Sequence, residues 1–303
     1  MIIRPRPGAF DLLFALRGSV VPIVAPRVLV IAALALALVI LDRRYPGTFP
    51  EFTAAPFTVF GFALSIFLGF RNSACHARWW EGRQLWGRLI TENRHFAREA
   101  AALLPDPAIR ARLLRRTAAF AHLLATGLRE LDGQDRARPW LPPEEAEALR
   151  GCRNRADAVL RWQSGDLAAL LREGRISDIL YTTLSAPLAG MTSVQAGCER
   201  IHNTPLPYAY SLLLHRTAWL FCLLMPFGFV GVLGLGTPVV AAILAYTLFG
   251  LDALGDELED PFGTETNDLA LDAMVRVIEI DLLEALGEAE RPEPLRPARY
   301  VLR

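Results

Sequence analysis

The sequence contains no lysine, so all 32 basic residues among its 303 are arginine, and 32 acidic residues balance them. A chain without net charge lacks the broad positive surface that nucleic-acid binding requires, and we expect no nucleic-acid partner. Only four cysteines occur, widely separated and without a C-x-x-C pair. This scarcity excludes a disulfide-stapled fold and argues against a zinc site built from cysteines.

Motifs of the common catalytic sites are also missing. The sequence has no G-x-S-x-G nucleophile elbow, no Walker loop and no H-E-x-x-H zinc motif. Its five histidines form no pair at metal-binding spacing, so packing or surface exposure explains each of them more simply. The sequence therefore predicts that the protein is not an enzyme.

Long uncharged runs alternate with arginine-rich polar stretches. The first two are VLVIAALALALVIL at 28–41, which extends back through the charged Arg27 to about residue 20, and FTAAPFTVFGFALSIFLGF at 52–70. A third run, at 217–251, has no charged side chain at all. A helix needs about 20 apolar residues to cross hydrocarbon, where backbone amides must bond internally. The runs predict membrane-spanning helices; the alternative is a soluble all-α protein that buries them.

The third run is long enough for two helices, and its middle at 226–238 (PFGFVGVLGLGTP) predicts a tight turn. We therefore expect an all-α integral membrane protein with four transmembrane helices and a large helical cytosolic part at 71–203 and 252–303. The approximate spans are 20–41, 52–70, 207–225 and 234–251. Arginines before the first span and after the second favour cytoplasmic termini. The arginine-, alanine- and leucine-rich composition is typical of a GC-rich bacterial genome, which predicts the inner (cell) membrane.

Phe62, Ile66 and Phe70 in the second predicted span follow one another at intervals of four residues. On an α-helix this spacing forms a stripe along one side. If identical helices surrounded an axis, the stripes would stack into three apolar rings, and a narrow apolar constriction stops ions by dewetting. Ordinary helix packing and a lipid-facing stripe give the same spacing, so the pattern alone leaves all three open.

Eight acidic residues crowd the stretch 252–272, around a turn at 261–263. Oxygen-rich clusters suit a hard cation such as Ca²⁺. A solvated acidic linker with a helix N-cap at Thr266 or Asn267 explains the same composition equally well.

Two further functions are compatible with these features. A membrane-embedded metalloenzyme would need the acidic cluster at 252–272 to converge with His202 or His215. A structural scaffold would bind a partner through its cytosolic helices, although nothing in the sequence specifies that partner.

Four segments are similar to the bestrophin family of ion channels, in particular to its bacterial branch. They are IFLGFRNSACHARWW at 66–80, GRISDIL at 174–180, GCERIHNTPLPY at 197–208 and LEDPFG at 258–263. Their order and spacing agree with the family, so the resemblance covers nearly the whole chain as one subunit, residues 1–303.

The resemblance implies a homopentameric channel in membrane lipid whose second helix lines a central pore. The three apolar rings of the family's neck fall on Phe62, Ile66 and Phe70, and a second constriction at the cytosolic exit falls on Ile179. Isoleucine at position 66 is typical of the bacterial branch, which resembles cation channels. We therefore expect monovalent cations to pass, with a chloride channel of the same fold as the alternative.

The resemblance also implies a divalent-cation site, Ca²⁺ or another ion, at the acidic loop. Its ligands would be the side chains of Glu257, Asp260, Glu265 and Asp268, and a backbone carbonyl near Gly8 or Ala9 of a neighbouring subunit. The sequence differs from the animal members in two ways. Its acidic run after Gly263 is sparser, and it carries acids at Glu257 and Asp260, where the animal members carry amides. Both departures weigh against activation by calcium.

Overall fold

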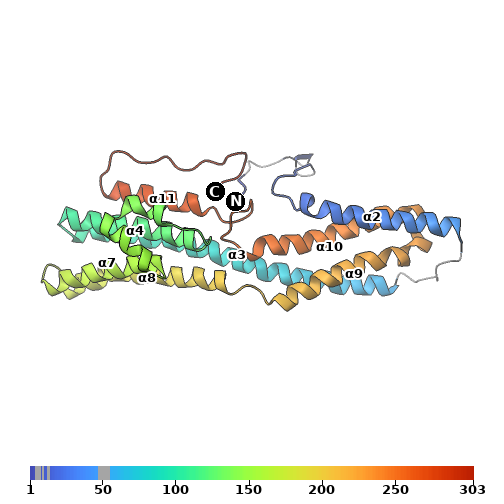
Figure 1. Ribbon diagram of the computed structural model, residues 1–303, viewed down its shortest axis with the longest axis horizontal. Helices are drawn as coiled ribbons and strands as arrows, with labels where there is room; N and C mark the ends of the chain where they lie inside the picture. Colours follow the sequence, from blue (N-terminus) through green and yellow to red (C-terminus); the bar gives the residue numbers. More distant parts are fainter. Residues whose placement is uncertain (4–7, 9, 12–13, 47–54) are drawn as a thin grey trace. The chain divides into compact units, whose positions relative to one another are not determined.

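The computed structural model describes residues 1–3, 8, 10–11, 14–46 and 55–303. Every regular element among these residues is helical, so the fold is all-α as predicted (Figure 1). The principal helices are α2 (Val21–Arg44), α3 (Ala55–Leu103), α4 (Pro107–Gly127), α7 (Arg155–Arg172), α8 (Asp178–Asn203), α9 (Tyr208–Leu233), α10 (Thr237–Glu259) and α11 (Leu271–Ala285). Shorter ones are α5 (Gln134–Ala137), η1 (Arg138–Trp140), α6 (Pro143–Ala148), η2 (Leu149–Gly151) and η3 (Gly234–Gly236).

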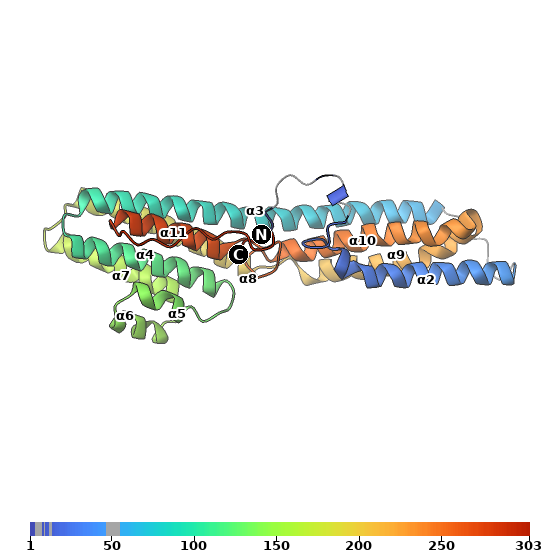
Figure 2. The ribbon, with the colours of Figure 1, turned by 90° about the horizontal axis from the view of Figure 1, so that it is seen from above.

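The chain divides into two compact units, to both of which α3 contributes residues (Figure 2). The first, here called the apolar unit, comprises Arg4–Trp79 and Pro205–Asp260 and contains α2, α9 and α10. The second, the polar unit, comprises Met1–Ile3, Trp80–Thr204 and Pro261–Arg303 and contains α4 to α8 and α11.

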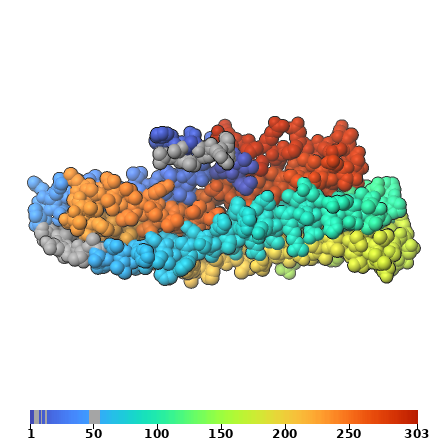
Figure 3. All heavy atoms as spheres, turned by 180° about the vertical axis from the view of Figure 1, so that it is seen from behind, coloured from blue at the N-terminus to red at the C-terminus, as the bar shows by residue number. Residues whose placement is uncertain are grey.

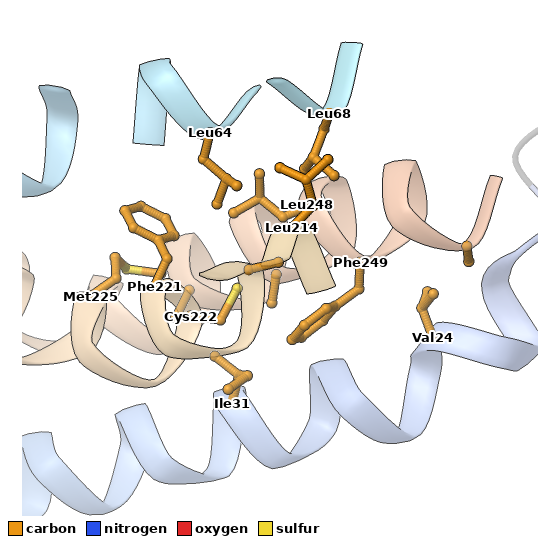
Figure 4. Close-up of a cluster of buried hydrophobic side chains, with 14 of the residues drawn as sticks. Val24, Ile31, Leu64, Leu68, Leu214, Phe221, Cys222, Met225, Leu248 and Phe249 are labelled. Atoms are coloured by element: carbon orange, nitrogen blue, oxygen red, sulfur yellow. The ribbon is translucent and has the colours of Figure 1, made fainter. Parts of the chain in front are cut away.

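The core of the apolar unit is a cluster of buried side chains from α2, α3, α9 and α10 (Figure 4). α2 packs most extensively against α10. Ala35 of α2 and Ala241 and Ala245 of α10 are buried in this core. Small residues let helix backbones approach closely, which is how helices associate in lipid, where burial of apolar surface gives no driving force.

Three helical stretches in the described part of the chain are long and apolar enough to cross a membrane. They are Val21–Arg44, Ala55–Leu103 and Tyr208–Glu259, the last of which contains both α9 and α10. The structure therefore agrees with a membrane protein built from helices.

The turn between α9 and α10 is shorter than predicted and lies in the later part of the predicted range. The sequence predicted a turn over 226–238, but α9 continues through Pro226 to Leu233, and the chain reverses in η3. Transmembrane helices tolerate proline because neighbouring groups satisfy the backbone that it leaves unpaired. The helix ends at Gly234, whose φ of +51° lies in the left-handed region that glycine adopts without a steric penalty.

α3 also differs from the predicted span, which covered 52–70. Residues 52–54 lie outside the described residues, and the helix continues without a break for 49 residues to Leu103. The arginine-rich stretch stays helical because apolar residues recur at helical spacing within it, and Leu89, Phe96 and Ala100 are buried.

The polar unit is organised around α4, which packs against both α7 and α11. Side-chain caps begin its helices: the Asp106 carboxylate accepts a hydrogen bond from the Ala108 amide at 2.9 Å, and Asn154 and Ser177 cap α7 and α8 in the same way. The unit buries charge as well as apolar surface. The Arg116 guanidinium is paired with Glu145 at 2.6 Å and with Asp166 at 2.9 Å.

Gly228 in α9 gives a test of the helix packing in the apolar unit. A Cβ atom at Gly228 would lie 2.4 Å from the Phe57 ring, whereas one at Gly231, on the same helix, would meet nothing within 4 Å. We expect Gly228→Ala to destabilise the purified protein by about 1–3 kcal/mol through overpacking. Gly231→Ala should leave the thermal midpoint in detergent unchanged or slightly raised, and equal midpoints for the two variants would contradict the packing.

Candidate functional site: the uncovered stripe of α3

Phe62, Ile66 and Phe70 lie on an uncovered side of α3. Their side chains are 69%, 41% and 63% exposed. Figure 3 shows this helix from its open side, where its light-blue to cyan atoms form part of the surface. Three large apolar side chains in a row are therefore left exposed by the part of the chain that the structure describes.

The opposite side of α3 makes the contacts with the apolar unit. Leu64 and Leu68 are buried and point toward α9 and α10 (Figure 4). A helix turns about 100° per residue, so Ile66, two residues from each of them, points about 160° away from both. Packing within the subunit therefore does not explain the stripe, and a surface toward lipid or toward another copy of the chain remains.

Arg71 follows Phe70 directly and points to the packed side, where it is 1% exposed. Its Nη1 donates to the backbone carbonyl and to the carboxylate Oδ1 of Asp252, both at 3.1 Å. Its Nη2 donates to Asp256 Oδ1 at 2.5 Å and to Glu259 Oε2 at 3.2 Å. The guanidinium thus ties α3 to three carboxylates of α10.

A histidine completes this cluster from α9. His215 Nδ1 lies 2.6 Å from the second carboxylate oxygen of Asp252, which is itself 1% exposed. A buried carboxylate requires such partners because its charge is removed from water. The closeness of the helices is aided by Gly255, where a Cβ atom would lie 2.9 Å from Arg71 Nη1.

Sequence reasoning missed the Arg71 cluster. It grouped Asp252, Asp256 and Glu259 with the other acids of 252–272 as a cation site or a solvated linker. A signal was present: these three residues follow the spacing i, i+4, i+7, which places them on one side of a helix, and Arg71 is the first charge after an uncharged run.

Another member of the acidic run, Asp272, is also bound by arginine, within the polar unit. Arg129 Nη1 lies 2.9 Å and Arg136 Nη1 2.6 Å from its carboxylate. Burial works to raise the pKa of Asp272, but hydrogen bonds and charge from the two arginines outweigh it and lower that pKa. Arg129 also donates to the backbone carbonyls of Phe262 and Gly263, and so holds the loop that carries two of the predicted cation ligands, Glu265 and Asp268.

The predicted cation ligands are divided between the two units of the chain. Ala9 lies outside the described residues, Glu257 and Asp260 belong to the apolar unit, and Glu265 and Asp268 belong to the polar unit. Asp268 accepts a hydrogen bond from the Glu265 amide at 2.6 Å, a local contact that needs no metal. Among the described residues, no three His, Cys, Asp or Glu side chains are grouped as a metal ion requires. The divalent-cation site stays a prediction.

The histidines of the metalloenzyme alternative are likewise engaged elsewhere. His215 does meet a carboxylate of the acidic run, but the same carboxylate binds Arg71. His202 lies 3.6 Å from Glu130 in the polar unit. These contacts give no open set of ligands for a catalytic metal.

Ile179, the predicted second constriction, stands at the start of α8. It is 73% exposed, directly after Ser177 and Asp178, and the Ser177 hydroxyl caps the helix by accepting from the Leu180 amide. The structure thus presents an apolar side chain at a rigid helix end, and its role as an aperture stays a prediction.

The Arg71 cluster predicts a strong effect of one substitution. Arg71→Met removes the cation from the buried carboxylate of Asp252, and loss of one partner of a buried pair costs about 3–5 kcal/mol. Arg88→Met, also on α3, removes an exposed pair with Glu92 and should cost under about 1 kcal/mol. Thermal unfolding in detergent measures both; an Arg71→Met midpoint equal to that of Arg88→Met would contradict the cluster's role.

Comparisons with known proteins agree with this geometry. The family model "Bacterial/Fungal Bestrophin protein" matches residues 1–284. A voltage-dependent anion channel-forming protein of Mesorhizobium japonicum is 47% identical over 98% of this chain and 96% of its own length. The voltage-dependent anion channel-forming protein YneE of Escherichia coli is 41% identical over 99% of both chains.

Among solved structures, a bacterial bestrophin homologue from Klebsiella pneumoniae is 36% identical, with a TM-score of 0.85 over 88% of this chain and 100% of that one. The relatives are channel-forming proteins, which confirms that this chain is not an enzyme. Their names specify anions, contrary to the cation selectivity predicted from the sequence. The chain belongs to the bestrophin family of channel-forming membrane proteins.

Proposed function

We propose that five copies of this chain form a channel for monovalent ions, with the Phe62, Ile66 and Phe70 stripes around a central pore. The observation that carries this proposal is the uncovered stripe on α3, opposite the side that packs in the subunit. The family of the chain supports a channel, and symmetric assembly gives one helix per subunit a shared axis. Each subunit would cross the bacterial inner membrane four times, through α2, the first part of α3, α9 and α10, with both termini in the cytoplasm.

The stripe would act as a hydrophobic neck. Large apolar side chains around a narrow path hold water weakly, and an ion that sheds its water there finds no charged or carbonyl group to replace it. Ile179 is proposed as a second apolar constriction on the cytosolic side. Surrounding lipid would cover the outer faces of α2, α9 and α10, where Leu29, Leu220 and Ile243 respectively are exposed.

We propose that the permeant ions are anions, in place of the cations predicted from the sequence. The names of the relatives support this choice. The stripe itself carries no charge, and two of its three members are phenylalanines, whose ring edges carry positive potential and stabilise anions weakly.

The neck predicts a gain of conductance when it is widened. Phe62→Ala, Ile66→Ala and Phe70→Ala combined should raise single-channel conductance in planar bilayers, because the path stays wet. The control is Phe67→Ala: this phenylalanine of α3 is 51% exposed but points about 100° from Ile66. Equal conductance of the triple variant and wild type, with both assembled as pentamers in native mass spectrometry, would contradict the neck.

Selectivity is tested separately, by reversal potentials of the purified wild-type protein under a KCl gradient. An anion channel reverses close to the equilibrium potential of chloride. Reversal close to that of potassium would restore the cation selectivity predicted from the sequence, while leaving the pore itself in place. Absence of any current from a verified pentamer would overturn the proposed function.

A further inference from the structure

A cavity of about 480 Å³ lies in the polar unit, among the ends of three helices. The end of α4 and the residues after it form one side, the start of α7 a second, and the end of α8 a third. Sites of this volume are typical for small molecules. The neck and the Arg71 cluster use none of its residues.

One wall of the cavity carries a carboxylate in a fixed position. Glu199 Oε1 accepts hydrogen bonds from Asn154 Nδ2 and from Gln195 Nε2, both at 2.8 Å. Gln195 is 4% exposed and also donates to Asn154 Oδ1 at 3.0 Å, so the three side chains form a connected network. The network holds Glu199 at the cavity before any ligand binds.

Positive charge also lines the cavity. Arg153 and Arg155 flank Asn154 and both line the cavity. Arg155 Nη1 is paired with Asp132 Oδ1 at 2.6 Å, so Arg153 is the arginine that a ligand would use. Asn154 also caps α7, because its Oδ1 accepts from the Asp157 amide at 3.1 Å. The first amides of an α-helix have no partner within the helix, so those of Arg155 and Ala156 are available to an anion at the cavity.

The side of the cavity formed by α4 and the residues after it is apolar. Leu123, Leu124 and Leu128 are buried in the fold, while Leu131 presents a half-exposed side chain to the cavity. The lining of the cavity thus combines one carboxylate, the arginine Arg153 and an aliphatic surface. This combination disfavours a simple anion, which would meet Glu199, and a simple cation, which would meet the arginines.

We propose that the cavity binds an α-amino acid with an aliphatic side chain. The ligand's carboxylate would bind Arg153 and the start of α7, its ammonium group Glu199, and its side chain the leucine wall. This effector site is independent of the ion path, so its success or failure leaves the proposed pore unaffected.

The test uses L-leucine and two analogues that each lack one charged group: 4-methylpentanoate, without the amine, and 3-methylbutylamine, without the carboxylate. Isothermal titration of the purified full-length protein in detergent should show L-leucine binding at least tenfold more tightly than either analogue. No binding of L-leucine, or equal binding of the three compounds, would overturn the proposal.

Substitutions locate the site. Glu199→Gln keeps a side-chain oxygen for Asn154 and Gln195 but removes the charge, and Arg153→Gln removes the opposite charge from an exposed position; each should weaken L-leucine binding at least tenfold. The control Arg161→Gln alters an exposed arginine of α7 that does not line the cavity. Thermal midpoints check that each variant is folded. Wild-type affinity in folded Arg153→Gln would also overturn the proposal.

Discussion

Arg71 places the strongest constraint on the apolar unit, because a buried guanidinium among apolar helices is tolerated only with opposite charges around it. The structure supplies Asp252, Asp256 and Glu259 from α10, and His215 completes the cluster through Asp252. These contacts fix both the rotation of α3 about its own axis and its position along α10. Apolar packing alone is less specific, since leucine and isoleucine side chains tolerate many alternative arrangements.

The rotation of α3 determines which side of the helix remains uncovered. Leu64, Leu68 and Arg71 all point to the packed side, so Ile66 must point away from it. A glycine at position 255 gives the guanidinium the space that it needs on α10. The proposed neck is therefore a consequence of how the charged cluster and the leucines hold the helix, rather than of contacts that the neck residues make themselves.

Sequence patterns predicted the helical class and the membrane helices because both depend on local properties, namely uncharged length and helical spacing. They made the α9–α10 turn too long because Pro226 and the glycines after it are ambiguous: the same residues end a helix in water and allow close packing in a membrane. Gly228 accommodates Phe57, a contact between residues 171 positions apart that no local pattern reports. The Arg71 cluster was missed for the same reason, since its charges come from distant parts of the chain.

The sign of ion selectivity depends on charge, and the proposed neck contains none. The carboxylates of Asp252, Asp256 and Glu259 lie on the packed side of α3, where they are bonded to the Arg71 guanidinium. They therefore do not provide a ring of negative charge around the stripe. The prediction of cations relied on the resemblance to the bacterial branch, for which Ile66 is typical, and an aliphatic side chain has no electrostatic preference for either sign. Selectivity must then arise from weak polarity at the ring edges of Phe62 and Phe70, or from charged groups outside the neck. A hydrophobic gate and an ion-selecting element are therefore separable in this architecture, and substitutions that widen the first need not alter the second.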